Sequence, residues 1–94
     1  MKQGFVYIMA NNRPTLHVSV TSNLVKRVYE HKNNFVLGFT AKYKLHKLVY
    51  YDTLVTIQRG IIREKQVKDM NREDKLKMIY LFNRKFRDLY QPIR

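Results

Sequence analysis

The chain has 94 residues, 45% of them hydrophobic, which allows one small domain with a thin core and excludes two domains. Lys and Arg number 19 against 7 Asp and Glu, and the net charge of +12 favours a polyanionic partner, with nucleic acid ahead of an anionic membrane surface. The absence of cysteine excludes disulfides, thiolate nucleophiles and thiolate zinc sites. No apolar run approaches the roughly 20 residues that span a bilayer, and the first residues lead straight into an alternating segment rather than a signal peptide, so we expect a cytoplasmic protein.

The first two predicted elements are strands over residues 4–10 and 15–21, which an Asn/Pro turn joins into a hairpin. If the aliphatic residues of both strands share the core face, Tyr7 lies on the opposite face together with His17. Two hydrogen-bonding rings would then stand side by side on the sheet. The alternative is an ordinary solvated sheet face.

A helix is predicted over residues 23–34, with capping side chains at its start in Thr21-Ser22-Asn23. His31 falls on its apolar side, between Leu24 and Phe35. A lone histidine in such a place is more often a satisfied core residue than a catalyst. Arg27, one turn earlier, cannot lose its charge to enter a core, so it must face a carboxylate, a phosphate or water at the edge of the apolar side.

The remaining elements are a loop, a third strand and further helices. The order β-β-α-β-α-α predicts an α/β (α+β) fold in a single domain over residues 1–94, with helices packed on a small three-stranded antiparallel sheet. The expected ranges are 37–46 for the loop, 47–53 for the strand, 56–69 for the next helix, about 72 onward for a helix after a break at Asn71, and Asn83 to Pro92 for a last short helix.

Glu64 occupies an unfavourable place on the helix at 56–69. The apolar stripe of that helix runs through Ile57 and Ile61, with Ile62 and Val67 less central. At about 100° per residue, Glu64 lies about 20° from Ile57, inside the stripe. Burying a carboxylate costs several kcal/mol unless it is compensated, and a divalent metal ion would compensate it. The alternative is a glutamate at the rim, paired with one of the many Lys and Arg residues.

Several segments in order resemble the GIY-YIG nuclease superfamily, and within it a small single-domain bacterial branch of endonuclease-like proteins. The likeness runs from about Gly4 to Tyr90. The segments are Gly4-Phe5-Val6-Tyr7-Ile8 for the first motif, Lys26-Arg27-Val28-Tyr29-Glu30-His31 for the motif arginine and histidine, Arg63-Glu64-Lys65-Gln66 for the metal-binding glutamate, and Gly38-Phe39-Thr40-Ala41-Lys42-Tyr43 with Leu48-Val49-Tyr50-Tyr51, which are typical of the branch.

The resemblance implies a DNA endonuclease that hydrolyses a phosphodiester with one divalent metal ion, Mg²⁺ or Mn²⁺. It implies that Glu64 is the metal ligand and that Arg27 stabilises the negative charge on the non-bridging phosphate oxygens. It makes Tyr7 the group that positions or deprotonates the attacking water, with His31 as a further catalytic residue. Asn83 stands where the family has a late asparagine, as a supporting residue.

The second motif departs from the family, because it normally reads Tyr-Ile-Gly and here reads His17-Val18-Ser19. With an ordinary pKa near 6.5, the replacing histidine is a better base at neutral pH than tyrosine, but it is shorter. Two hypotheses therefore stand. One is an active endonuclease with catalytic His17, of low sequence specificity or dependent on DNA structure, in repair, recombination or defence. The other is a catalytically impaired nucleic-acid-binding module on the same fold.

Basic side chains of the loop and of the following strand and helix form the predicted DNA-binding surface, where phosphate contacts would be salt-dependent and largely independent of sequence. A third hypothesis, a generic basic RNA-associated protein, explains the net positive charge of the chain but not the Glu64 carboxylate in the apolar stripe. No organic cofactor is expected. The predicted DNA-binding residues are Lys42, Lys44, Lys47, Arg63, Lys65 and Lys68.

Overall fold

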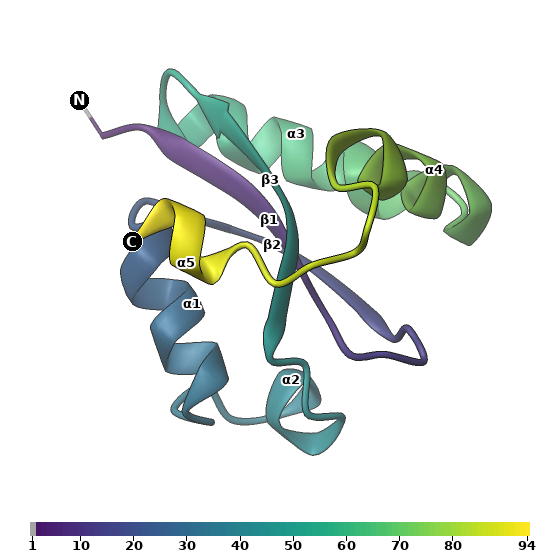
Figure 1. Cartoon of the computed structure of the whole chain (residues 1–94). Coiled ribbons are helices and arrows are strands. Elements are labelled where there is room, and N and C mark those ends of the chain that lie inside the picture. Colours follow the sequence, from purple (N-terminus) through teal and green to yellow (C-terminus); the bar gives the residue numbers. More distant parts are fainter. Residues whose placement is uncertain (1) are drawn as a thin grey trace.

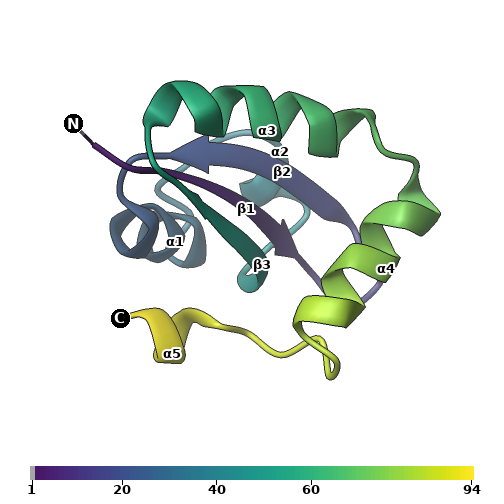
Figure 2. The same ribbon diagram turned by 90° about the horizontal axis from the view of Figure 1, so that it is seen from above.

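The computed structural model describes residues 2–94 and contains a three-stranded antiparallel sheet in the order β2-β1-β3, with helices against both of its faces (Figures 1 and 2). The predicted fold class is confirmed. Within residues 2–94, no helix is both long and apolar enough to cross a membrane. The elements are β1 (Gly4–Ala10), β2 (Leu16–Thr21), α1 (Leu24–Lys32), α2 (Phe39–Lys42), β3 (Lys47–Leu54), α3 (Ile57–Asp69), α4 (Arg72–Phe82) and α5 (Tyr90–Ile93).

The hairpin register divides the side chains between the two sheet faces as the sequence predicts. Tyr7 is opposite Ser19 and Met9 is opposite His17, so these four side chains share one face. The aliphatic residues take the other face, where α3 and α4 pack on them. That core contains Val6, Ile8, Ala10, Val18, Val49, Tyr50, Val67 and Ile79.

The face that carries Tyr7 is covered rather than solvated. Helices α1 and α5 lie on this side of the sheet, opposite α3, as Figure 2 shows. Tyr7 is only 1% exposed, which excludes the alternative of an ordinary solvated sheet face. The second core cluster here contains Tyr7, Met9, Leu24, Val28, Leu45 and Leu48.

Helix α3 approaches the start of β1 very closely because both contact positions are glycine. A Cβ atom on Gly4 would lie 2.7 Å from the backbone oxygen of Thr56, and one on Gly60 would lie 3.0 Å from Val20 Cγ2. Neither position has room for a larger residue without a shift of its neighbours. The contact fixes α3 against the sheet, and Glu64 follows Gly60 by about one helical turn.

Three apolar residues that were expected in the helical stripes are exposed. Helix α1 ends at Lys32, and the positive φ of Asn34 takes Phe35 out of the helical register, leaving it 66% exposed. In α3 the glycine contact turns Gly60 and Val67 inward, so Ile61 and Ile62 are exposed. The prediction for Phe35 was wrong because the helix ends before this residue, and those for Ile61 and Ile62 were wrong because a tertiary contact set the buried side of α3.

Two further expectations for the loops and the C-terminal region are corrected. The expected loop contains the short helix α2, which begins after Gly38 at a φ of 99°. Asn83 ends α4 instead of starting a helix, because its backbone leaves the helical region at a φ of −141° and a ψ of 81°, and its side-chain oxygen then accepts a hydrogen bond from the Arg87 N–H at 3.1 Å. Pro92 lies inside α5 rather than ending it, in the first turn, where a missing N–H has no helical partner to lose.

Candidate active site

A buried chain of three hydrogen-bonded side chains joins β1, α1 and α2. Tyr7 Oη lies 2.8 Å from His31 Nε2, and His31 Nδ1 lies 3.1 Å from Thr40 Oγ1. The three residues are 1%, 2% and 3% exposed. His31 is therefore a satisfied core histidine and, at the same time, the hydrogen-bond partner of Tyr7.

His31 is neutral at physiological pH. Burial, reinforced by the positive charges that His17 and Arg27 carry or can carry, lowers the pKa of His31 from 6.5 to about 4. A neutral imidazole has one donor nitrogen and one acceptor nitrogen. When Nδ1–H donates to Thr40, Nε2 is free to accept the hydroxyl proton of Tyr7.

The Tyr7 hydroxyl keeps its proton at neutral pH. Burial raises the pKa of Tyr7 above its ordinary 10.0, while the polar groups of Ser19 and Arg27 act in the lowering direction. Tyr7 can therefore accept a proton only as it passes its own proton on. His31 Nε2 is in place to receive it.

His17 lies near this chain, on the edge strand β2. Its ring centre is 6.2 Å from that of His31, and it stacks on Phe39 of α2 at 5.9 Å. Burial lowers the pKa of His17, as does the charge of Lys68, whereas Glu64 acts in the raising direction. Burial thus favours the uncharged form of His17, and the charges of Lys68 and Glu64 on α3 act on its pKa in opposite directions.

Arg27 lies beside the hydrogen-bonded chain of Tyr7, His31 and Thr40, at the edge of the apolar side of α1, as the sequence predicts. Its Nη1 lies 3.2 Å from Glu30 Oε1, and the side chain is 43% exposed. It borders a polar hollow of about 320 Å³, which Thr21, Asn23 and Lys26 also line. An arginine anchored on one side in this way can present its other N–H donors to an anion.

Glu64 is largely buried, as its position on the helix predicts. The side chain is 15% exposed, and its one ion-pair partner within residues 2–94 is Lys68 Nζ at 3.5 Å. An ion pair at this distance offsets little of the free-energy cost of burying the Glu64 carboxylate. A lone carboxylate of this kind fits one position of a Mg²⁺ ion, which prefers oxygen ligands and keeps several waters. No cluster of three or more His, Asp or Glu side chains suited to a metal occurs in the described chain.

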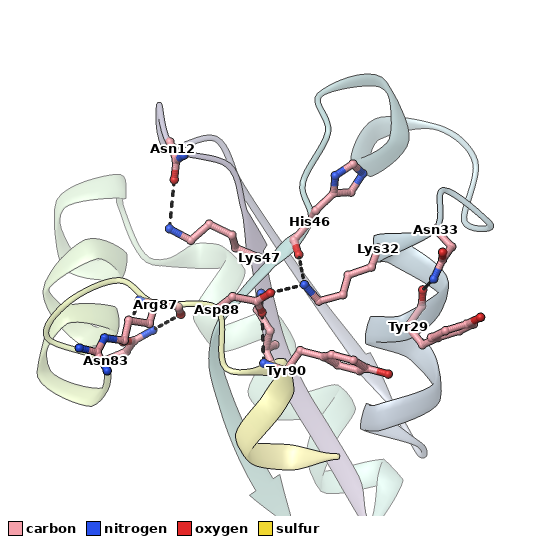
Figure 3. A network of polar contacts seen from close by, with 11 residues as sticks. Asn12, Tyr29, Lys32, Asn33, His46, Lys47, Asn83, Arg87, Asp88 and Tyr90 are labelled. Atoms are coloured by element: carbon pink, nitrogen blue, oxygen red, sulfur yellow. Dashed lines mark hydrogen bonds and ion pairs between the residues drawn. The ribbon is translucent and has the colours of Figure 1, made fainter.

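Asn83 makes contacts of a different kind from those of the other predicted site residues. Its side-chain nitrogen donates to the backbone oxygens of Val49 at 3.1 Å and Arg87 at 2.7 Å. Figure 3 shows it tying the end of α4 to the segment that returns toward α5. Its place in the fold is that of a structural cap, with each of its amide atoms committed to backbone groups.

The six predicted DNA-binding residues are not equivalent. Lys47 Nζ donates to Asn12 Oδ1 at 3.0 Å, a contact that Figure 3 marks with a dashed line, and Arg63 Nε lies 3.5 Å from Asp52 Oδ2, so both side chains are engaged within the chain. The other four are exposed: Lys42 and Lys44 border an open pocket beside the β1–β2 turn, Lys65 lies on α3, and Lys68 is the partner of Glu64.

Sequence reasoning did not single out the partners of the predicted residues. Glu30 follows Arg27 by three positions, a spacing that favours an ion pair on one helix and could have indicated it. Thr40 has no such signal, because its contact with His31 depends on the fold of α2. Phe39 against His17 is likewise a consequence of tertiary structure.

The sequence of the chain matches a known protein family. Residues 3–78 match the family model described as the GIY-YIG catalytic domain. The chain belongs to the GIY-YIG family. This GIY-YIG chain is 33% identical over 79 residues to a UPF0213 protein of Staphylococcus epidermidis, covering 84% of this chain and 96% of the relative. It is 31% identical over 80 residues to a UPF0213 protein of Syntrophus aciditrophicus, covering 84% and 92%.

A solved structure supports the same fold. The GIY-YIG chain resembles the solution NMR structure of a UPF0213 protein from Bacillus halodurans with a TM-score of 0.54, at 19% identity and 84% coverage of each chain. The family match and the bacterial relatives confirm the sequence resemblance to a small bacterial branch of GIY-YIG proteins. Tyr7, the predicted first-motif tyrosine of this GIY-YIG domain, is the residue that His31 contacts.

Proposed function

We propose that this chain is a metal-dependent DNA endonuclease that hydrolyses phosphodiester bonds, with low sequence specificity or a dependence on DNA structure, in repair, recombination or defence. Membership of a nuclease family supports the reaction class. The observation that carries the proposal is the 2.8 Å hydrogen bond between Tyr7 and His31, because it offers a route for the proton of an attacking water. The net charge of +12 supports a polyanionic substrate.

In the proposed reaction a water oxygen forms a bond to phosphorus as the bond between phosphorus and the leaving oxygen breaks. The water proton passes to Tyr7 Oη while the Tyr7 proton passes to His31 Nε2, so that no tyrosinate is needed in advance. The low pKa of His31 then favours release of that proton to solvent. The leaving oxygen takes a proton from solvent. Thr40 acts as a positioning residue that holds His31 in the accepting tautomer.

Arg27 and Glu64 handle the charge of the phosphate in this proposal. Arg27 binds the non-bridging oxygens, a bidentate task for which its planar guanidinium is suited. Glu64 holds the Mg²⁺ or Mn²⁺ ion, which when bound polarises the phosphoryl group and stabilises the leaving oxygen. Lys68 neutralises Glu64 in the metal-free chain and exchanges that partner for phosphate.

The alternative function, a catalytically impaired nucleic-acid-binding module, is favoured by a specific observation. His17 replaces the second motif tyrosine and packs under the ring of Phe39, and Tyr7 is almost fully buried. A site closed in this way would admit water to Tyr7 only if the elements packed over it moved aside. On this reading the basic surface alone would act, and Glu64 would have no role in binding.

The test is cleavage of supercoiled, linear and branched DNA in Mg²⁺ or Mn²⁺, with and without a chelator. Glu64→Gln and Arg27→Ala are expected to lower the rate at least about a hundredfold, as loss of a charge-stabilising group commonly does. Glu73→Gln is the matched control, because this carboxylate is exposed and lies outside the site. A His17→Tyr variant tells whether the histidine improves or handicaps the reaction.

The outcomes separate the two functions. Metal-dependent cleavage by wild type and Glu73→Gln, lost in Glu64→Gln, supports the nuclease. Absence of cleavage with salt-sensitive DNA binding, unchanged by chelator, supports the binding module. Equal cleavage by all variants reveals a contaminating nuclease and counts against the proposed roles of Glu64 and Arg27.

A further inference from the structure

Three aromatic rings form a row that begins at the candidate site and continues along α2. Phe39 stacks on His17 with 5.9 Å between the ring centres, and the Tyr43 ring lies 4.8 Å from that of Phe39. Phe39 and Tyr43 are one helical turn apart, whereas Thr40 between them turns inward to His31. Phe39 is 47% exposed and Tyr43 is 39% exposed, so the row presents aromatic surface to solvent.

Hydrogen bonds on both sides of α2 hold this aromatic row in place. Thr40 Oγ1 lies 3.1 Å from His31 Nδ1, and the Leu45 N–H donates to the Thr40 carbonyl at 2.9 Å. Asn11 Nδ2, in the turn between β1 and β2, donates to the Tyr43 carbonyl at 3.0 Å, and both segments lie toward the lower edge of Figure 1. Rings on an anchored backbone lose little conformational freedom when a ligand stacks on them.

Basic and amide side chains line the pocket that adjoins Tyr43. The lining residues are Asn11, Asn12, Arg13, Lys42, Tyr43 and Lys44. The pocket has a volume of about 600 Å³, within the roughly 300–1,000 Å³ of small-ligand sites. The only acidic residue among the first 51 of the sequence is Glu30, which pairs with Arg27. Among residues 2–94, none of the three pocket cations takes part in an ion pair, so their charge is available to an anionic ligand.

Aromatic surface beside cations without ion-pair partners matches the chemistry of an unpaired nucleic-acid strand. Every base can stack on an aromatic ring, and a base that is unpaired has its face free to do so. Lys42 Nζ lies 5.5 Å from the centre of the Tyr43 ring, so a phosphate flanking a stacked base would meet a positive charge there. An apolar protein partner would explain the exposed rings but would leave the three pocket cations without a counter-charge.

We propose that the aromatic row of His17, Phe39 and Tyr43 binds unpaired nucleotides of DNA by base stacking, while the pocket cations bind the flanking phosphates. This assignment rests on the proposed function and makes it more specific, because it selects a dependence on DNA structure. The row starts at His17, whose ring centre is 6.2 Å from that of His31, so unpaired nucleotides would lie next to the candidate site. The favoured substrates are therefore single strands, flaps and bubbles rather than fully paired duplex.

Binding in the presence of a chelator tests the aromatic row separately from cleavage. Fluorescence anisotropy of the full chain in EDTA compares a labelled, unstructured single strand of DNA with the blunt duplex of the same sequence. A basic surface alone favours the duplex, because two strands place more phosphate charge along the same length than one strand does. Since base stacking requires unpaired bases, we expect the wild type to bind the single strand more tightly instead.

Substitutions at Phe39 separate stacking from simple apolar contact. Phe39→Leu keeps an apolar side chain over His17 but removes the ring, so it should weaken single-strand binding about tenfold and change duplex binding little. Phe39→Tyr should bind as the wild type does. Tyr80→Ala is the matched control, because Tyr80 is 46% exposed but lies on α4, on the aliphatic side of the sheet. Lys44→Gln should reduce the salt dependence of single-strand binding by about 0.7 in the slope of log K against log salt concentration. Circular dichroism checks that the variants are folded.

The outcomes distinguish this assignment from the nuclease proposal. A single-strand preference that is lost in Phe39→Leu and kept in Phe39→Tyr and Tyr80→Ala supports it, even if no DNA is cleaved in Mg²⁺. Equal or tighter binding of the duplex by the wild type overturns it, as does a Phe39→Leu variant that keeps the preference, although metal-dependent cleavage would still support the nuclease. Tighter binding of the RNA strand of the same sequence also overturns it, because the row would then belong to an RNA site.

Discussion

The two faces of the sheet bury side chains of different chemistry, although the same three strands supply both. Under α3 and α4 the core is almost wholly aliphatic, with Val6, Ile8 and Ile79 each fully buried. Under α1 and α2 the core contains the hydrogen-bonded chain of Tyr7, His31 and Thr40. Burial of the aliphatic side chains stabilises the fold directly, whereas burial of the polar chain costs free energy unless each partner stays in place.

The difference teaches that the two faces are sensitive to different changes, the aliphatic face to lost volume and the polar face to lost hydrogen-bonding groups. An aliphatic core loses stability through the buried surface that is removed and the cavity that is left. The polar face instead depends on protonation state and on single hydroxyl groups, because removing one partner leaves a buried polar atom unpaired. We therefore expect variants of the aliphatic face to change stability alone, and variants of the polar face to change pH dependence and activity as well.

The largest expected effect comes from the aliphatic face. Ile79→Ala should lower the free energy of unfolding by about 2–5 kcal/mol, because it leaves a cavity beside α4. Leu81→Ala is the control on the same helix, and its 88% exposure predicts a change within about 0.5 kcal/mol. Urea unfolding measures both. If cleavage per folded molecule also fell in Ile79→Ala, the separation between the two faces would fail.

The second effect is a loss of stability in acid that originates in the polar face. The pKa of His31 is about 4 in the folded chain and 6.5 as its ordinary value, so the unfolded chain binds more protons between these pH values. The free energy of unfolding should thus fall as pH drops from 6.5 to 4, by up to about 3 kcal/mol from this group. The lowered pKa of His17 acts in the same direction.

Urea unfolding at several pH values from 7 to 4, together with NMR titration of the imidazole protons, measures this acid effect. His31→Asn keeps hydrogen-bonding capacity without a titrating group, so its stability should depend less on pH in this range. A His31 ring that became protonated near pH 6.5 would contradict the effect of burial.

The smallest effect concerns a single hydroxyl group. Thr40→Val keeps the shape of the side chain but removes the hydrogen bond to His31 Nδ1, which should cost about 1 kcal/mol of stability. If the proposed proton route operates, kcat should fall about tenfold, with a change in its pH profile and little change in KM. Thr40→Ser should restore both. Equal loss in Val and Ser variants would assign Thr40 a role in packing only.

The sequence predicted the position of the strands, of α1, α3 and the start of α4, because alternation and capping side chains are local signals. Residues 4–10 and 47–53 became β1 and β3 with at most one residue of difference at an end. Asn71 caps α4 by accepting from the Asp74 N–H at 2.8 Å, at the break that was expected there. The hairpin alternation also placed Tyr7 and His17 on one face, as the register confirms.

Part of the candidate site followed from the same local patterns. Arg27 and His31 are one turn apart on a single helix, so their proximity needs only the helical repeat. Glu64 was expected on the inner side of α3 by its angle to Ile57, and its side chain is indeed only 15% exposed.

What only the tertiary structure decided is which helix faces are buried and which side chains complete the site. The Gly4–Gly60 contact set the rotation of α3, exposing two isoleucines that apolar spacing had placed inward. Thr40 reaches His31 because a four-residue helix folds over β2 and α1, a contact with no periodic signature in the chain. Apolar periodicity is a property of the residues within one helix or strand. Close approach between elements depends instead on the volumes of side chains from distant segments, which come into contact only when the sheet and helices pack.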